Sequence, residues 1–438
     1  MENSVPQRIA NILINALKGG VVPRVGLEYA TVGRTQEIAA ILHDIDMISD
    51  GGASFRFIVG KYGSGKSFLL QTIRNYATAK GFAVVDADLS PERRFAGTKG
   101  QGLATYKELL SNLSTKSKPD GGALPLILEK WISGVQSSVK AQTGLEGERF
   151  EQQVEKQIYA VAGSLEGMVN GFDFAKAITT YWRAYRQGET VLKSNVLKWF
   201  RGEYTSRRDA KADLDINFIV TDETWYDFLK IFAVFLTGAG YKGMLVLIDE
   251  LVNIFKIPNS ITRQNNYEKI LTIYNDVLQG KARHIGFLMG GTPQCVEDKY
   301  RGVFSYEALK SRLAEGHFAT DDIKDLSAPI IRLQMLTQEE MYVLVEKLRD
   351  IHAQLYQYSP SLNHEELVYF LTVEYNRVGA DTHITPREII RDFIELAGIL
   401  HQNPQKNVAD ILGSNNFEMA KGGLTDEEIH SEFAEFEV

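Results

Sequence analysis

A glycine-rich loop set between two apolar segments is the feature that most constrains the fold of this chain. The apolar run 55–59 precedes the loop, and the loop has the sequence Gly60-Lys61-Tyr62-Gly63-Ser64-Gly65-Lys66-Ser67. The apolar residues Phe68-Leu69-Leu70 follow it. A strand, a loop with the spacing Gly-x-x-x-x-Gly-Lys-Ser and a helix together form a P-loop unit. The pattern therefore predicts an α/β core with a parallel sheet.

The chemistry of this loop predicts a site for a nucleoside triphosphate. Glycines let the backbone wrap closely around a polyphosphate, where a Cβ would clash. The loop N–H groups form an anion-binding nest, and the following helix adds positive potential at its N-terminus. We expect Lys66 to reach the β- and γ-phosphates of ATP and the Ser67 hydroxyl to ligate Mg²⁺. A flexible glycine turn before a helix is the alternative.

Composition limits the classes of protein to consider. The 438 residues are 44% hydrophobic and 24% charged, as in soluble globular proteins with two or three structural units. The lone cysteine, Cys295, excludes an internal disulfide framework and suits a reducing cytoplasm. We find no secretory signal and no apolar run of the roughly 18 residues that span a bilayer, so we expect a cytoplasmic protein without a membrane partner. The net charge of −8 restricts any nucleic-acid contact to a local surface.

Periodicity predicts the secondary structure of the core and of what surrounds it. The predicted strands are 55–59, 82–86, 244–248, 285–289 and 330–333. The predicted helices outside the insertion include 6–19, 35–48, 65–80, 264–278, 338–355, 365–373 and 386–399. The distance along the chain from Lys66 to Asp249 is far more than one helix and one or two strands require, which indicates a helical insertion.

These elements predict a P-loop NTPase core that carries a large helical insertion and a C-terminal helical lid. The predicted divisions are 1–99 (N-terminal helices and the first half of the core), 100–240 (insertion), 241–334 (second half of the core), 335–402 (lid) and 403–438 (acidic tail).

A second chemical signal is the acidic pair in Ile248-Asp249-Glu250. It follows a buried apolar run, at the end of a strand where an open parallel sheet places residues that contact ligands. We expect Asp249 to complete the Mg²⁺ site with Ser67, and Glu250 to act as the general base that activates water. An acidic surface corner is the alternative. An Asp-Glu pair favours hydrolysis over a small-molecule kinase.

Three further residues are candidates for contact with the γ-phosphate. Thr292 follows the predicted strand 285–289, where its hydroxyl could contact the γ-phosphate or water, or lie in a plain turn. Arg312 ends a predicted helix and fits an arginine finger that enters a neighbouring subunit, or else a surface salt bridge. Arg387 opens a lid helix and could reach the γ-phosphate, or be a charge at a helix start.

The order of these motifs resembles that of AAA+ ATPases. Val32-Gly33-Arg34, the P-loop, the acidic pair, Thr292, Arg312 and Arg387 follow one another as in the Orc/Cdc6-like initiators and their STAND relatives. The resemblance implies that Val32 and Gly33 lie beside the adenine base, and the predicted nucleotide-binding set also includes Phe68. It further implies that Thr292 is sensor 1, Arg312 the finger of a homo-oligomer and Arg387 sensor 2.

A closer resemblance is to the bacterial DUF2791 proteins, which include the ATP-binding BrxD proteins of BREX phage-resistance systems. It is carried by the loop with its tyrosine, by Ala16-Leu17-Lys18-Gly19-Gly20-Val21-Val22-Pro23 and by Ile384-Thr385-Pro386-Arg387-Glu388. The resemblance implies an ATPase in antiviral defence with a helicase or DNA-modifying partner. The segment after the lid helices is too short and too acidic for a DNA-binding winged helix, so DNA binding is not carried over from the initiators.

One segment of the predicted insertion has the composition of a surface for single-stranded nucleic acid. Residues 181–211 contain eight cations, namely Arg183, Arg186, Lys193, Lys198, Arg201, Arg207, Arg208 and Lys211, against three acids. The interleaved aromatic residues are Tyr181, Trp182, Tyr185, Trp199, Phe200 and Tyr204. Cations that follow phosphates and rings that stack on bases make such a channel. The alternative places Trp182, Trp199 and Phe200 in the core and the cations on a solvated face.

Three functions are consistent with these motifs. The favoured one is an ATPase that hydrolyses ATP between subunits and remodels or loads a nucleic-acid-processing partner. The second is a STAND-like nucleotide-gated switch with slow hydrolysis. The third, a small-molecule phosphotransferase, lacks a second acid-and-base cluster for an acceptor. Steady turnover separates the first from the second, and a phosphorylated product would identify the third.

Overall fold

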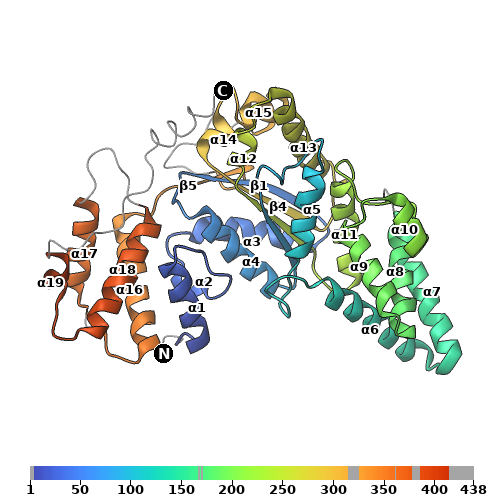
Figure 1. The fold of residues 1–438 in the computed structure, drawn as a ribbon, viewed down its shortest axis with the longest axis horizontal. Coiled ribbons are helices and arrows are strands. Elements are labelled where there is room, and N and C mark those ends of the chain that lie inside the picture. Colours follow the sequence, from blue (N-terminus) through green and yellow to red (C-terminus); the bar gives the residue numbers. More distant parts are fainter. Residues whose placement is uncertain are drawn as a thin grey trace. The chain divides into compact units, whose positions relative to one another are not determined.

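The computed structural model describes residues 4–165, 168, 171–313, 325–360, 362–376 and 385–413. Its core is a five-stranded sheet in the order β2-β3-β4-β1-β5 (Figure 1). The strands are β1 (Ala53–Gly60), β2 (Ala83–Asp88), β3 (Met244–Asp249), β4 (Ile285–Gly291) and β5 (Ile330–Leu333). β1 pairs with β4, β4 with β3 and β3 with β2, all in parallel. This confirms the predicted α/β P-loop NTPase core.

The central strands form where the sequence has unbroken apolar runs. Every residue of β4 is buried, as are the first five residues of β3. Strands covered by helices on both faces need such runs, because neither face meets water. The strand predicted over 82–86 continues to Asp88, because Asp88 pairs with Asp249 of β3.

The helices cover this sheet and extend well beyond it. Before the sheet come α1 (Gln7–Lys18), α2 (Leu27–Ala30) and α3 (Thr35–Ser49), and α4 (Lys66–Ala79) follows β1. Between β2 and β3 lie α5 (Gln101–Ser111), α6 (Leu124–Thr143), α7 (Gly147–Leu165), α8 (Gly171–Gln187), α9 (Thr190–Phe200), α10 (Arg207–Leu214) and α11 (Trp225–Gly238). Before β5 come α12 (Val252–Phe255), α13 (Ser260–Leu278), α14 (Pro293–Glu297), a 3₁₀ turn (Val303–Ser305) and α15 (Glu307–Leu313). After β5 come α16 (Gln338–Tyr356), α17 (His364–Asn376), α18 (Pro386–Gln402) and α19 (Val408–Leu412).

Helix boundaries differ from the predicted ones mainly where a cap was not recognised. The helix predicted from 264 begins at Ser260, because the Asn259 side chain accepts a hydrogen bond from the N–H of Thr262 and caps it. Most of the predicted acidic tail, residues 414–438, lies outside the described residues. None of the helices in the described part of the chain combines the length and the apolarity needed to cross a bilayer.

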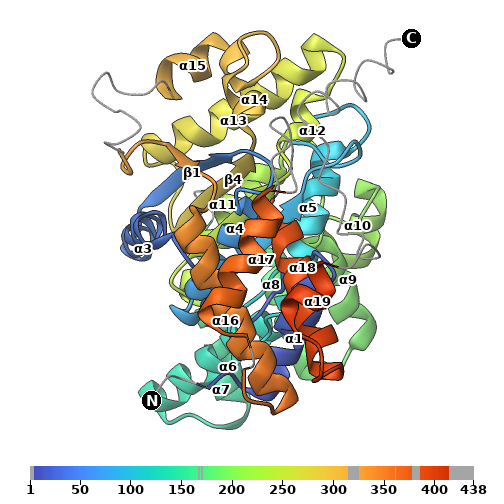
Figure 2. The ribbon, with the colours of Figure 1, turned by 90° about the vertical axis from the view of Figure 1, so that its left-hand side faces the viewer.

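The contacts between residues divide the described chain into two compact units. The predicted division into five segments is not tested by this grouping and stays a prediction. The first unit contains the described residues of 1–38, 60–75 and 332–438. It has its own apolar cluster, in which α1 packs on α16 and α18. Figure 2 views the lid helices α16 to α19 of this unit from the front. The second unit contains 39–59 and the described residues of 76–331, and with them most of the sheet and the insertion.

The insertion is held together by aromatic rings. Figure 1 shows α6 to α10 gathered at one end of the second unit, beyond α5 and α11. At the centre of this bundle the Phe174 ring contacts Phe200 with a centroid distance of 5.1 Å and Phe235 at 5.6 Å, both edge to face. The Trp199 indole N–H donates to the Phe218 carbonyl, so its polar atom is satisfied inside the core. The predicted helical insertion is thus a packed bundle, and its buried residues belong to the same apolar cluster as those of the sheet.

A buried ion pair joins α3 to β1 in the second unit. Arg56 of β1 donates two hydrogen bonds to the carboxylate of Asp44 on α3, at 2.7 and 2.8 Å, and a third to the Ala328 carbonyl. Ser54 donates to the same carboxylate at 2.8 Å. Both charged residues are less than 10% exposed, at 8% for Arg56 and 5% for Asp44. Among the described residues, Asp44 is the acid that forms a salt bridge with this guanidinium.

We predict that Asp44→Ala lowers the free energy of unfolding by about 3–5 kcal/mol, because it leaves the Arg56 charge buried without its partner. The measurement is denaturant unfolding followed by circular dichroism. Asp46→Ala is the matched control, since Asp46 lies on the same helix but pairs with Lys80 at the surface, and it should cost less than about 1 kcal/mol. Equal costs for the two variants would contradict the prediction.

Candidate functional site

The glycine-rich loop has the backbone that its sequence predicts. Gly63 and Gly65 adopt positive φ angles of 77° and 85°, a region that residues with a Cβ avoid. At Gly63 a Cβ would also lie 2.8 Å from the Cβ of Thr385. The loop ends at Lys66, where α4 begins, so it leads directly into a helix N-terminus. This is the geometry in which backbone N–H groups and a helix dipole bind phosphate.

Two side chains of the loop are placed to meet a ligand. The Lys66 ammonium donates to the carbonyls of Gly60 and Lys61, both at 2.9 Å, and so lies folded over the loop. Ser64 is 2% exposed, and its hydroxyl makes no hydrogen bond to the described residues. A buried polar group without a partner is rare in native structures and calls for an explanation, such as a ligand at the site.

Arg34 donates a hydrogen bond to a backbone carbonyl of the loop, a role that the sequence analysis did not assign to it. The guanidinium is 7% exposed and donates to the Ser64 carbonyl at 3.0 Å and to the Gln334 carbonyl at 2.5 Å. Burial lowers the pKa of Arg34, while the charges of Glu37 and Glu340 oppose that shift. The feature of the sequence from which this role could have been predicted is the arginine of the Val32-Gly33-Arg34 segment. Its cationic side chain stabilises the carbonyl side of the loop.

Val32 and Phe68 lie beside the apolar cluster of the first unit, and Gly33 belongs to the same unit. Val32 and Phe68 are partly buried hydrophobic residues packed against that cluster. Gly33 has a φ of 68°, and the space of its missing Cβ is occupied by the carboxylate of Glu340. These contacts place the three residues in the same unit as the loop. They provide partly exposed apolar surface of the kind that a base could cover.

Arg387 also lies close to the loop. It belongs to the first turn of α18, and its guanidinium donates to the Tyr62 hydroxyl at 3.0 Å. The guanidinium carbon is 5.6 Å from the centre of the Tyr62 ring. The structure thus brings a loop residue and the predicted sensor arginine together within one unit.

The acidic pair lies in the second unit, at the carboxyl edge of the sheet. In the register of the sheet, Ile248 of β3 is paired with Met289, and Val59 of β1 with Gly291. Asp249 and Glu250 therefore leave the sheet at the edge where β1 and β4 also end. The Glu250 N–H donates to the Asp249 carboxylate at 2.9 Å. Glu250 has a φ of 60°, a left-handed conformation that is costly for a residue with a Cβ.

Asp88 is a third acid at this edge and was missed by the sequence analysis. It ends β2 and is paired directly with Asp249. Desolvation, followed by the charges of Asp249 and Asp86, raises the pKa of Asp88. The sequence offers a sign of this acid in the pattern Asp86-Ala87-Asp88. The predicted strand ended at residue 86 and therefore did not include Asp88. The neighbouring acids concentrate negative charge at this edge, and together with burial they make Asp88 easier to protonate.

Thr292 has a structural role that the sequence did not reveal. Its hydroxyl accepts from the N–H of Cys295 and caps α14. The N–H of Thr292 in turn donates to the Cys295 sulfur at 3.0 Å. A hydroxyl that accepts one hydrogen bond can still donate its own proton. The cap and a contact with phosphate or water are therefore compatible.

Arg312 is exposed on the second unit. It lies in the last turn of α15, and its guanidinium donates back to the Ala308 carbonyl at 2.7 Å. The carbonyl of Arg312 accepts a long hydrogen bond from the Tyr274 hydroxyl. The side chain is exposed on the surface of this unit.

The sequence matches a known protein family. The model of the family described as BREX system ATP-binding protein BrxC/D matches residues 5–416. The chain belongs to this family. The match covers nearly the whole chain and assigns it an ATP-binding role in BREX defence. A search of curated proteins finds no match.

In this BrxC/D family member most of the aromatic residues of 181–211 are not available to stack on bases, and Tyr185 is the exposed one. Five of the six rings are at most 2% exposed, namely Tyr181, Trp182, Trp199, Phe200 and Tyr204. Arg183 and Arg186 pair with Glu155 and Glu151, and Lys193 pairs with Glu129. The alternative stated from the sequence, with the named rings in the core, is confirmed.

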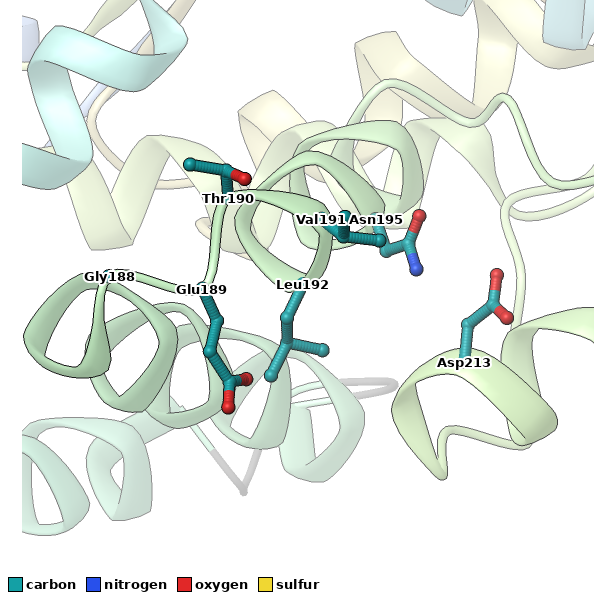
Figure 3. A pocket seen from close by; sticks show the side chains of 7 residues that line it. All are labelled: Gly188, Glu189, Thr190, Val191, Leu192, Asn195 and Asp213. Carbon is teal, nitrogen blue, oxygen red and sulfur yellow. The ribbon is translucent and has the colours of Figure 1, made fainter.

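The same segment borders an open cavity of about 510 Å³ in the insertion (Figure 3). Its lining is Gly188, Glu189, Thr190, Val191, Leu192, Asn195 and Asp213. This lining includes two carboxylates and lacks a lysine or arginine, which does not suit a phosphate backbone. The Tyr204 hydroxyl donates to Asp213 at 2.7 Å and holds that carboxylate at the rim.

We predict that Thr292→Asp folds normally but loses ATP turnover. Aspartate caps a helix at least as well as threonine, but it adds a negative charge at the edge of the sheet where a γ-phosphate is expected. Thr292→Ser, which keeps the hydroxyl, is the control and should retain both stability and turnover. The measurements are thermal unfolding and phosphate release. Turnover by Thr292→Asp equal to that of Thr292→Ser would leave Thr292 as a helix cap alone.

Proposed function

We propose that this BREX ATP-binding protein is a Mg²⁺-dependent ATPase whose hydrolysis cycle remodels or loads a nucleic-acid-processing partner. The observation that carries the proposal is the conformation of Glu250. A glutamate held in a left-handed conformation directly after a buried strand stores strain, and such strain is found where the direction of a side chain matters. A general base for water at the carboxyl edge of a parallel sheet is the function that fits it best.

In the proposed hydrolysis of ATP, different residues bind the phosphates, accept the proton of water and donate hydrogen bonds. The loop N–H groups and Lys66 bind the β- and γ-phosphates, which turns the ammonium away from the loop carbonyls that it contacts here. Glu250 accepts the proton of the attacking water. Asp88, which is paired with Asp249 in the sheet, would hydrogen-bond to a water at this edge. Thr292 donates its hydroxyl proton toward the phosphate or the water.

The donor set fits Mg²⁺. Mg²⁺ prefers oxygen ligands, keeps several waters and uses one or two carboxylates together with substrate phosphates. Ser67 offers a hydroxyl and Asp249 a carboxylate, and these would hold the ion. When bound, Mg²⁺ neutralises charge on the β- and γ-phosphate oxygens. Val32, Gly33 and Phe68 would contact the base, since Val32 and Phe68 border the apolar cluster of the first unit and Gly33 follows Val32.

Measurement of ATPase rate per subunit against protein concentration, with and without single- and double-stranded DNA, tests the proposal. We expect steady turnover that rises with concentration and with nucleic acid. Lys66→Ala should abolish ATP binding, because the loop loses its phosphate cation. Glu250→Gln should bind ATP but stall, because an amide cannot accept the proton from water.

The outcomes separate the functions. A flat, slow rate indifferent to DNA, with nucleotide tightly retained, would favour a nucleotide-gated switch. A phosphorylated small-molecule product would favour a phosphotransferase. Normal hydrolysis by Lys66→Ala would overturn the assignment of the loop.

We further propose that the ATPase works as a homo-oligomer in which Arg312 completes the site of a neighbour. An exposed arginine at the end of a helix suits such a contact, in which it neutralises charge in the transition state. A helicase or another protein of the defence system is the proposed partner. No direct DNA contact through 181–211 is included, because five of its six rings are buried and three of its cations are paired.

We predict that Arg312→Ala is inactive alone and regains turnover when mixed with Lys66→Ala. In the mixed assembly the Arg312→Ala subunit has an intact loop, and its Lys66→Ala neighbour supplies the arginine. The measurement is ATPase rate against the mixing ratio, with a maximum expected at intermediate ratios. Lys310→Ala is the matched control, because Lys310 lies on the same helix and pairs with Glu307. Absence of rescue would assign Arg312 a role within its own subunit.

A further inference from the structure

Tyr62 is an exposed aromatic residue inside the phosphate-binding loop. Its side chain is 57% exposed, and it follows Lys61 directly. A large ring on such a loop has no part in binding phosphate by backbone N–H groups, which needs only small residues. Its observed contact is with Arg387, by a hydrogen bond of 3.0 Å and by a guanidinium placed 5.6 Å from the ring centre.

The arginine is held along its whole length. The Cδ of Arg387 lies 3.5 Å from where a Cβ of Gly20 would be, so its aliphatic stem runs over the turn after α1. Its guanidinium then ends on the Tyr62 ring and hydroxyl. A cation over an aromatic face, with a hydrogen bond to the same side chain, selects one direction for a side chain that otherwise has many rotamers.

The start of α18 is itself fixed against the loop. Thr385 and Glu388 form a capping box in which the N–H and hydroxyl of Thr385 donate to the Glu388 carboxylate at 2.7 and 2.8 Å. The Thr385 side chain lies where a Cβ of Gly63 would be. Two successive loop residues, Tyr62 and Gly63, therefore contact two residues at the start of one lid helix, Arg387 and Thr385.

We propose that Tyr62 is the positioning residue for Arg387, which it orients beside the loop so that the lid distinguishes ATP from ADP. This deepens the proposed function and rests on it. ATP and ADP differ by the γ-phosphate, so an arginine aimed at that phosphate stabilises ATP selectively. Tyr62 contributes through Arg387 and not through the nucleotide.

The test compares binding of a non-hydrolysable ATP analogue with binding of ADP, by calorimetry. We expect Arg387→Ala and Tyr62→Ala each to lower the ratio of analogue affinity to ADP affinity by about tenfold, while ADP affinity stays near wild type. Tyr62→Phe keeps the ring and loses the hydrogen bond, so its ratio should fall between wild type and Tyr62→Ala. The double variant should match the single ones, because the two residues act as one unit.

Tyr369→Ala is the matched control, since Tyr369 is an exposed tyrosine of the same unit on α17 and should leave the ratio unchanged. A ratio unchanged in both Tyr62 variants, or additive losses in the double variant, would overturn the inference. These results are distinct from failure of the proposed function, in which the wild-type protein would bind the nucleotides without hydrolysing ATP. A fall in ADP affinity equal to the fall in analogue affinity would also overturn it, because it would show a general loop defect.

Discussion

The carboxyl ends of parallel strands all lie at the same edge of a sheet. The positions of the candidate catalytic acids in the second unit depend on this constraint. The pairing of β2, β3 and β4 puts Asp88 level with Asp249, and the ends of β3 and β4 close to one another. A shift of one residue in either pairing would turn the acidic residues to the opposite face. The buried apolar runs of β3 and β4 fix the register, so packing of the core determines where the carboxylates lie.

The phosphate-binding loop depends on different interactions. Its backbone is stabilised from the carbonyl side by Arg34 and from the lid side by Thr385 and Arg387. These residues come from the N-terminal segment and the lid, and they share a unit with the loop. The loop is therefore surrounded by groups that are far away in the sequence. The BrxC/D family model matches residues 5–416, which include the loop, the N-terminal segment and the lid helices.

Local patterns were enough to predict the core strands, the helices around them and the loop, because apolar runs and glycine spacing act over short distances. The parts that the sequence analysis missed depend on pairing between distant segments. Asp88 gains its place from the register with β3, and Arg34 from a carbonyl in the loop. The composition of 181–211 could not show that its rings face inward, because amphipathic helices of a core and of a nucleic-acid surface contain the same residue types. Thr292 as a helix cap required the position of the N–H of Cys295.

The packing of α1 on α16 and α18 has a consequence for the order of events during synthesis. The N–H of Val5 donates to the Gln354 side chain across 349 positions of sequence. At translation rates of about 5–20 residues per second, an interval on the order of half a minute separates the synthesis of α1 from that of the helices on which it packs. The second unit has by then been made in full. The nucleotide loop therefore gains its complete support late, and the growing chain cannot hold ATP in its final geometry before the lid helices have emerged.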